Sequence, residues 1–215
     1  MLYHWAVART EDHLHPNETQ RIEAFSDGVF AIAITLLIIE IGVPHVRGNE
    51  SLASALGDLW PSYGAYVLSF VMIGIYWVNH HSFFRLFVRT DHYFLMLNVF
   101  FLMAIAFLPF PTAVLGEYLD NAQQRDAAVR LYALGLLLPA FGWIVVWLYA
   151  NARGLVDERL APEYVRFLTV QYLLSNVLYG SALLLSFLDP WVALVIVVGL
   201  TLLYLLPPRR PRYAE

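Results

Sequence analysis

The sequence predicts an all-α integral membrane protein with six transmembrane helices per subunit. Of its 215 residues, 60% are hydrophobic and 14% are charged, and the mean hydropathy is +0.60. A soluble domain of this size does not need so much apolar surface, whereas each helix that crosses a bilayer needs about 20 mostly apolar residues. Apolar stretches of this kind recur six times along the chain, separated by short polar segments.

The first apolar stretch, residues 20–43, has the clearest pattern. Its length is sufficient to cross a hydrocarbon core of about 30 Å at about 1.5 Å per residue. Between Gly28 and Ile39 no residue is charged, and Thr35 is the only polar side chain. Gly42 and Pro44 follow, and they give the helix a natural end.

Five further stretches are expected to form the remaining transmembrane helices. They cover residues 61–80, 91–110, 127–150, 164–187 and 191–206. Pro109 and Pro111 are expected to end the third helix, and Pro139 to kink the fourth, because proline removes a backbone donor and clashes with the preceding turn.

The arginines indicate which side of the membrane each loop faces. All thirteen basic residues are arginine; with six spans, ten fall on the side of the termini and three on the other. Because cytoplasmic loops are enriched in Lys and Arg, both termini are expected in the cytoplasm, with the protein in the inner (plasma) membrane. The chain thus divides into a cytoplasmic arm (1–19), a six-helix transmembrane domain (20–206) and a cytoplasmic tail (207–215).

Composition and motifs exclude several classes of function. The net charge of −4 is spread over the loops, which argues against a nucleic-acid partner. The chain has no cysteine, so disulfides, thiol catalysis and cysteine metal sites are excluded. It contains no G-x-S-x-G, H-E-x-x-H or Walker motif, so we expect no enzyme activity and no cofactor.

Projection of the first helix at about 100° per residue separates two faces. One face, called here the smooth face, is formed by Gly28, Ile32, Leu36 and Ile39, with Thr35 beside it. The roughly opposite face carries Glu23, Asp27, Ile34 and Ile41. On periodicity alone, the smooth face would pack against a neighbouring helix, as most such faces do.

The same helix carries a recognisable motif. Arg21-x-x-x-Phe25-Ser26-Asp27 is followed by G-V-F-A-I-A-I-T-L-L-I-I-E-I, and W-V-N-H-H closes the second span. The run from Arg21 to Ile41 resembles the first-helix signature of the transmembrane protein 175 family, the lysosomal potassium channels of animals and their shorter prokaryotic relatives. One copy of the signature with six spans is similar to the prokaryotic form.

The resemblance implies a homotetramer in which helix 1 of each subunit lines a central pore for potassium and other monovalent cations. Carried over by position, Ile32, Leu36 and Ile39 form the constriction, and Thr35 forms a polar selectivity layer beside them. The implied function is a passive potassium-permeable channel with a hydrophobic constriction and modest selectivity for potassium over sodium. The implied partners are the other subunits and the lipid bilayer, with no cofactor besides the permeant ion.

Polar residues at one end of helix 1 are expected to meet the end of helix 2. Asp27 lies about 9 Å along helix 1, at a depth similar to that of the W-V-N-H-H segment. A buried carboxylate at this depth needs a donor or counter-charge. The candidate network, with the F-S-D motif packed on helix 2 as the resemblance implies, consists of Arg21, Phe25, Ser26, Asp27, Trp77, Asn79, His80 and His81. A fixed polar clamp and a titrating gate both remain open.

A second function remains open beside the channel. Asp27, Glu23 and Glu40 are acids at the two ends of helix 1, and a proton-coupled secondary transporter would use such groups. The sequence shows no internal repeat and no pair of broken helices, which are two common signs of a transporter. The channel is therefore the preferred prediction.

Overall fold

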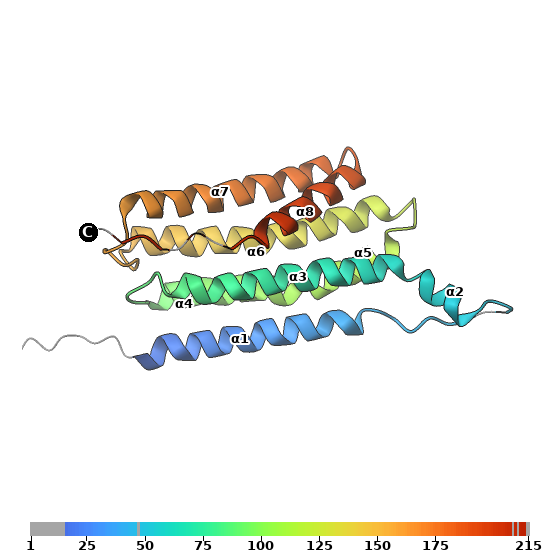
Figure 1. Ribbon diagram of the computed structural model, residues 1–215, viewed down its shortest axis with the longest axis horizontal. Helices are drawn as coiled ribbons and strands as arrows, with labels where there is room; N and C mark the ends of the chain where they lie inside the picture. Colours follow the sequence, from blue (N-terminus) through green and yellow to red (C-terminus); the bar gives the residue numbers. More distant parts are fainter. Residues whose placement is uncertain (1–15, 47, 208, 210, 214–215) are drawn as a thin grey trace, which may run out of the picture.

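The computed structural model describes residues 16–46, 48–207, 209 and 211–213. This part of the chain forms a bundle of eight helices (Figure 1). Their bounds are α1 Pro16–Ile39, α2 Leu52–Gly57, α3 Trp60–Phe84, α4 His92–Phe107, α5 Pro109–Tyr118, α6 Arg125–Ala152, α7 Pro162–Leu185 and α8 Pro190–Tyr204. The expected all-α class is confirmed. Most of the expected N-terminal arm, residues 1–15, lies outside the described residues.

The six expected spans correspond to α1, α3, α4 together with α5, α6, α7 and α8. Five helical segments in the described part of the chain are long and apolar enough to cross a membrane. The sixth, α8, is apolar but has only 15 residues. At about 1.5 Å per residue it spans roughly 22 Å, less than the hydrocarbon core.

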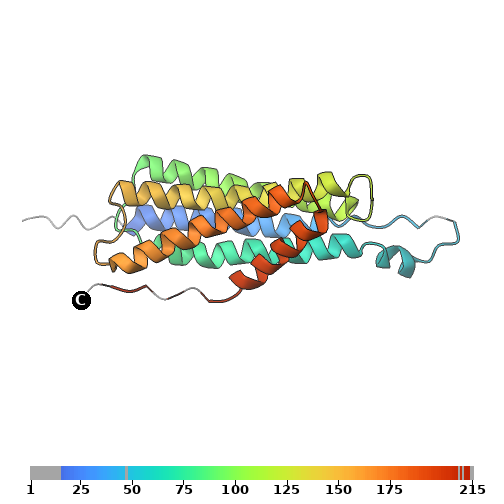
Figure 2. The ribbon, with the colours of Figure 1, turned by 90° about the horizontal axis from the view of Figure 1, so that it is seen from above.

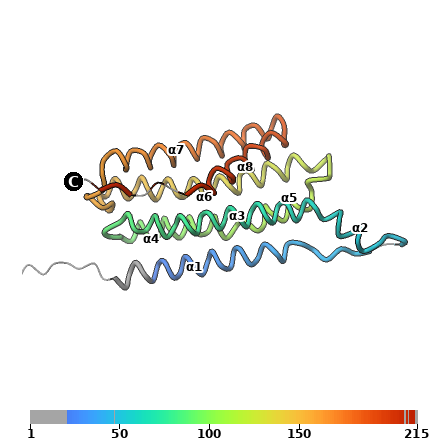
Figure 3. The backbone as a smooth tube through the Cα atoms, viewed as in Figure 1, coloured from blue at the N-terminus to red at the C-terminus, as the bar shows by residue number. Residues whose placement is uncertain are grey.

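The long helices run alternately up and down the bundle, as the trace in Figure 3 shows. Helix α1 lies at one edge, where it packs against α3, α4 and α5. Helix α6 is central and contacts α4, α5, α7 and α8. The start of α1 and the end of the described chain lie at the same end of the bundle in both Figure 1 and Figure 2, so the chain crosses its length an even number of times.

Several helix boundaries differ from the sequence prediction: α1 ends at Ile39 and not at residue 43, α3 extends to Phe84, and two further differences involve prolines. The third helix was expected to stop at Pro109 and Pro111, but Leu108 only interrupts it, and α5 continues to Tyr118. Proline is well tolerated in the first turn of a helix, where its missing N–H would have no partner, so Pro109 restarts the helix instead of ending it. For the same reason α1 begins earlier than residue 20, with Pro16 in its first turn.

Small residues let α5 approach its neighbours closely. A Cβ atom added at Gly116 would lie 2.9 Å from the Cα atom of Ser62 in α3, and one added at Gly135 in α6 would lie 2.8 Å from Cγ of Pro111. Beside these contacts, Ser69 of α3 is hydrogen-bonded to the Thr112 hydroxyl at 2.7 Å and to the Tyr132 hydroxyl at 2.9 Å. These contacts hold α3, α5 and α6 together, and α1 packs against α3 and α5 of this group.

Candidate functional site

Helix α1 is attached to its subunit by one narrow face. Ser26, Phe30, Ala33 and Leu37 are each at most 1% exposed. Their spacing of three and four residues places them along one side of the helix. Phe30 packs edge-on to the His80 ring, with 5.4 Å between ring centroids. Because this face supplies the buried contacts of α1, the remaining surface of the helix is free to serve another purpose.

The smooth face lies outside these contacts. Ile32 is 61% exposed, Leu36 40% and Ile39 72%, and Gly28 and Thr35 are exposed with them. No described residue of the subunit covers this face. By contrast Ile34 and Ile41, expected on the opposite side of α1, are half-buried. The smooth face therefore has no packing partner within the described subunit.

Thr35 presents an oxygen on the exposed side of α1. Its Oγ1–H donates to the backbone carbonyls of Ala31 and Ile32, with both oxygens 2.9 Å away. A threonine hydroxyl has one hydrogen and two lone pairs, so using the hydrogen within the helix leaves the lone pairs available. The Thr35 oxygen accepts neither of these hydrogen bonds, so its lone pairs can bind a cation while both bonds remain in place.

The carboxylate of Asp27 is exposed, whereas the sequence predicted a buried one. Within the expected network, Trp77 makes the contact: its indole Nε1–H donates to Asp27 Oδ1 over 2.9 Å. His81 lies instead against Glu23, with 3.5 Å between Nδ1 and Oε2. Arg85 donates to the other ring nitrogen of His81 over 2.8 Å. Asp27 and Glu23 are thus held by Trp77 and His81, which lie one turn apart on α3.

His80 does not contact Asp27 in the way the sequence suggested. It is 3% exposed, and its Nε2 lies 3.1 Å from Asn98 Oδ1 in α4. The Asn98 amide in turn donates to the Ser26 hydroxyl over 3.3 Å. The His80 ring stacks on Phe101, with 5.8 Å between centroids and an interplanar angle of 10°. His80 therefore belongs to a buried chain of hydrogen bonds that joins α3, α4 and α1.

Sequence analysis missed Asn98 and wrongly included Asn79. Asn98 was not among the predicted residues, yet its amide links His80 to Ser26. The Asn79 amide donates to Ile75 within its own helix, and the side chain lines a cavity facing α7. Arg21 and Phe25 are both exposed. A signal for Asn98 was its position, since a polar side chain inside an apolar span needs a partner.

Comparison with known proteins identifies the family. Residues 21–109, from α1 to the start of α5, match the family model described as "Endosomal/lysosomal potassium channel TMEM175". A protein of Chamaesiphon minutus named a potassium channel is 47% identical over 180 residues, covering 82% of this chain and 88% of the relative. The chain belongs to the TMEM175 family. A potassium channel of Streptomyces collinus is 42% identical over 174 residues, covering 80% of this chain and 84% of that protein.

A solved structure supports the same assignment for this TMEM175 family member. The crystal structure of a lysosomal potassium-selective channel TMEM175 homologue from Chamaesiphon minutus superposes with a TM-score of 0.79 and 42% sequence identity. The match covers 88% of this chain and 97% of that one. The family and the helical membrane fold are therefore established for nearly the whole bundle.

The buried Asn98 chain leads to a stability prediction. Asn98→Leu keeps the approximate size of the side chain but leaves His80 and Ser26 without their partner. An unpaired buried polar group costs about 1–3 kcal/mol, so we expect a clear fall in the thermal unfolding midpoint of the detergent-solubilised protein.

The matched control is Asn79→Leu, which removes only a bond to the carbonyl of the same helix. It is expected to change the unfolding midpoint much less. Equal losses for both variants would show that the buried chain contributes nothing particular to the attachment of α1.

Proposed function

We propose that this TMEM175 family member is a passive potassium-permeable cation channel in which four subunits place α1 around a central pore. The observation that carries the proposal is the combination on α1 of an exposed apolar face with an exposed Asp27. An apolar face alone can face lipid, but a carboxylate at membrane depth is expensive in hydrocarbon. A helix with both features suits a position between subunits beside a water-filled path. The relatives named potassium channels support the same function.

The proposed constriction is formed by Ile32, Leu36 and Ile39, which all lie on the exposed side of α1. Four copies of a branched apolar side chain around an axis leave a passage that water does not fill continuously. A bare cation in such a passage has lost its hydration shell and finds no replacement ligand. The barrier is thus controlled by whether the rings are wide enough to be wetted, which is a hydrophobic gate.

The proposed selectivity layer is formed by Thr35. Between Gly28 and Ile39 it is the only side chain with an oxygen, and its lone pairs are not used by the helix hydrogen bonds of its own hydroxyl. Four hydroxyls offer far fewer ligands than the stacked carbonyl rings of a selectivity filter. We therefore propose that potassium is favoured over sodium, but modestly.

The proposed orientation places both termini in the cytoplasm of a cell with the protein in its inner membrane. The even number of crossings and the excess of arginine at the end where the chain begins and finishes support it. In this orientation Glu23 and Asp27 lie on the cytoplasmic side of the constriction. Their negative charge would concentrate cations at that entrance.

The function is tested by recording the purified protein in planar bilayers with potassium on one side and sodium on the other. We expect discrete single-channel currents that rise in proportion to voltage, with a reversal potential that favours potassium. Flux that saturates with ion concentration and depends on a proton gradient would instead indicate a transporter that uses Asp27, Glu23 or Glu40.

Ile32→Asn should hydrate the apolar ring proposed at Ile32, the branched apolar residue of the smooth face nearest the Phe25-Ser26-Asp27 motif. We expect a higher resting cation leak and weaker discrimination between cations, because an amide lets water and ions pass where isoleucine excludes them. Leu36→Asn and Ile39→Asn should have smaller effects of the same kind. Single-channel conductance and the thermal unfolding midpoint are measured for each variant.

Ile34→Asn is the control for these substitutions. Ile34 is half-buried against the bundle. An amide there should mainly reduce the free energy of unfolding, by about 1–3 kcal/mol, and so lower the unfolding midpoint. If Ile32→Asn only unfolds the protein while Ile34→Asn conducts, the pore lies on the other side of α1.

Thr35→Val keeps the shape of the side chain and removes its oxygen. If potassium loses about 1 kcal/mol more contact energy than sodium does, the potassium-over-sodium permeability ratio should fall roughly fivefold while conduction persists. The measurement is the shift in reversal potential under the two-ion conditions above.

Thr201→Val in α8 is the matched control, because Thr201 Oγ1 also donates to a backbone carbonyl four residues earlier, at 2.9 Å. It should leave the reversal potential unchanged. A reversal potential that stays the same in Thr35→Val would assign selectivity to another part of the protein.

A further inference from the structure

The short α8 leaves part of the bundle without a helix. Helix α7 has 24 residues, whereas α8, which returns alongside it, has 15. About 13 Å of the length of α7 is therefore not matched by α8. The chain after Tyr204 runs on as an extended tail towards the end of the bundle where α7 begins (Figure 2).

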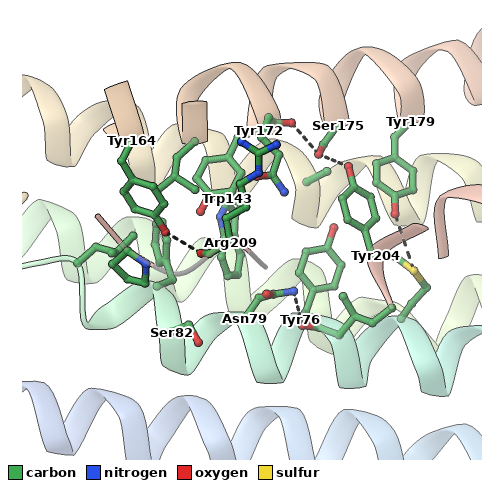
Figure 4. A pocket seen from close by; sticks show the side chains of 18 residues that line it. Tyr76, Asn79, Ser82, Trp143, Tyr164, Tyr172, Ser175, Tyr179, Tyr204 and Arg209 are labelled. Atoms are coloured by element: carbon green, nitrogen blue, oxygen red, sulfur yellow. Dashed lines mark hydrogen bonds between the residues drawn. The ribbon is translucent and has the colours of Figure 1, made fainter. Parts of the chain in front are cut away.

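A cavity of about 260 Å³ occupies this space between α3, α6, α7, α8 and the tail. Figure 4 shows aromatic side chains around it, with Trp143, Tyr172 and Tyr204 among them. The other walls include apolar side chains such as Met72, Ile75 and Leu168, together with the polar side chains of Gln171 and Ser175. The cavity reaches the surface at Ser82 and Arg209, which are exposed. It is thus an apolar chamber with one cationic side chain at its mouth.

The arginine at the mouth is held in place. The Tyr164 hydroxyl donates to the carbonyl of Arg209 over 3.2 Å, and the guanidinium carbon lies 4.4 Å from the centre of the Phe167 ring. Further along the tail, the N–H of Ala161 donates to the carbonyl of Arg212 over 2.9 Å. These contacts anchor the tail across the start of α7. The side-chain N–H groups of Arg209 remain available as donors. The contact with Phe167 is a cation–π interaction, which depends on the charge of the guanidinium and does not occupy its N–H groups.

We propose that this cavity binds one acyl chain of an anionic phospholipid, whose phosphate is bound by Arg209. An acyl chain suits the apolar walls, and a planar guanidinium binds phosphate with two parallel hydrogen bonds. Arg212 in the same tail supplies a further positive charge at this end of the bundle. Basic pockets between transmembrane helices at a membrane surface recognise anionic headgroups in this way.

The site is separate from the proposed pore. It lies on the far side of α3 from α1 (Figure 4), and its walls come from α3, α6, α7 and α8. Binding of a lipid there does not require ions to pass along α1. The proposal therefore stands or falls independently of the channel function, and its test uses no current measurement.

The test measures thermal unfolding of the purified full-length protein in detergent with added lipid. Dioleoyl phosphatidylglycerol is compared with dioleoyl phosphatidylcholine, which has the same chains and no net charge. We expect the anionic lipid to raise the unfolding midpoint at lower concentrations than the zwitterionic one. Arg209→Gln should weaken the apparent affinity for phosphatidylglycerol by roughly fivefold, the size expected for one arginine at an anionic membrane surface.

Arg212→Gln is the matched control, because Arg212 lies in the same tail but does not line the cavity. It should keep most of the response to phosphatidylglycerol. Ser82→Trp places a bulky side chain at the mouth and should abolish the response. Equal responses to the two lipids, or equal losses in the two arginine variants, would overturn the proposal. An equal, Arg209-dependent response to oleate would also overturn it by assigning the site to a free fatty acid.

A second measurement on the unmodified protein covers the case in which a variant fails to fold. Phosphatidylglycerol that carries a photoreactive diazirine in one acyl chain is irradiated with the protein, and the labelled peptides are identified by mass spectrometry. We expect labels on the cavity walls, at residues such as Ile75 and Leu168. Labels confined to the outer surface of α4 would contradict the site.

Discussion

The attachment of α1 through one narrow buried face, flanked by the half-buried Ile34, is the constraint on which the rest of the structure depends. Phe30, Ala33 and Leu37 bury apolar surface there, and Ser26 makes the polar contact. In a bilayer, apolar burial between helices adds little driving force, because lipid chains are as apolar as the side chains. Close packing and the Ser26–Asn98–His80 hydrogen bonds therefore carry much of the attachment.

The buried and exposed positions of α1 therefore respond differently to substitution. Substitutions at Phe30 or Ala33 act on the attachment, whereas those at Ile32 or Leu36 change a surface that the subunit does not use. The neighbouring residues differ in role because successive side chains of a helix point about 100° apart. A stable attachment on one side allows the residues of the exposed side to change without loss of the fold.

The sequence was sufficient to predict the long apolar helices, since they follow from the runs of apolar residues. It predicted neither the short helix α2 nor the face of Ser26, Phe30, Ala33 and Leu37 that attaches α1. It was not sufficient to predict the partners within W-V-N-H-H. Four candidate side chains in one turn cannot all face α1: Trp77 and His81 do, His80 faces α4, and Asn79 faces α7. Which of them meets α1 depends on the rotation of α3 about its axis, and only the packed bundle fixes that rotation.

The cavity behind α3 escaped prediction for a related reason. The sequence indicated that the last helix is short and that an arginine-rich tail follows it, but it gave no path for that tail. The path is set by contacts between distant residues, such as Tyr164 with the carbonyl of Arg209. Because the tail packs against the start of α7, it encloses the space that a longer α8 would fill, and this space is a cavity. Aromatic rings from α3, α6 and α7 line it, and among them Trp143 also packs edge-on to His80, with 6.3 Å between centroids. One layer of side chains thus joins the wall of the cavity to the residues that hold α1.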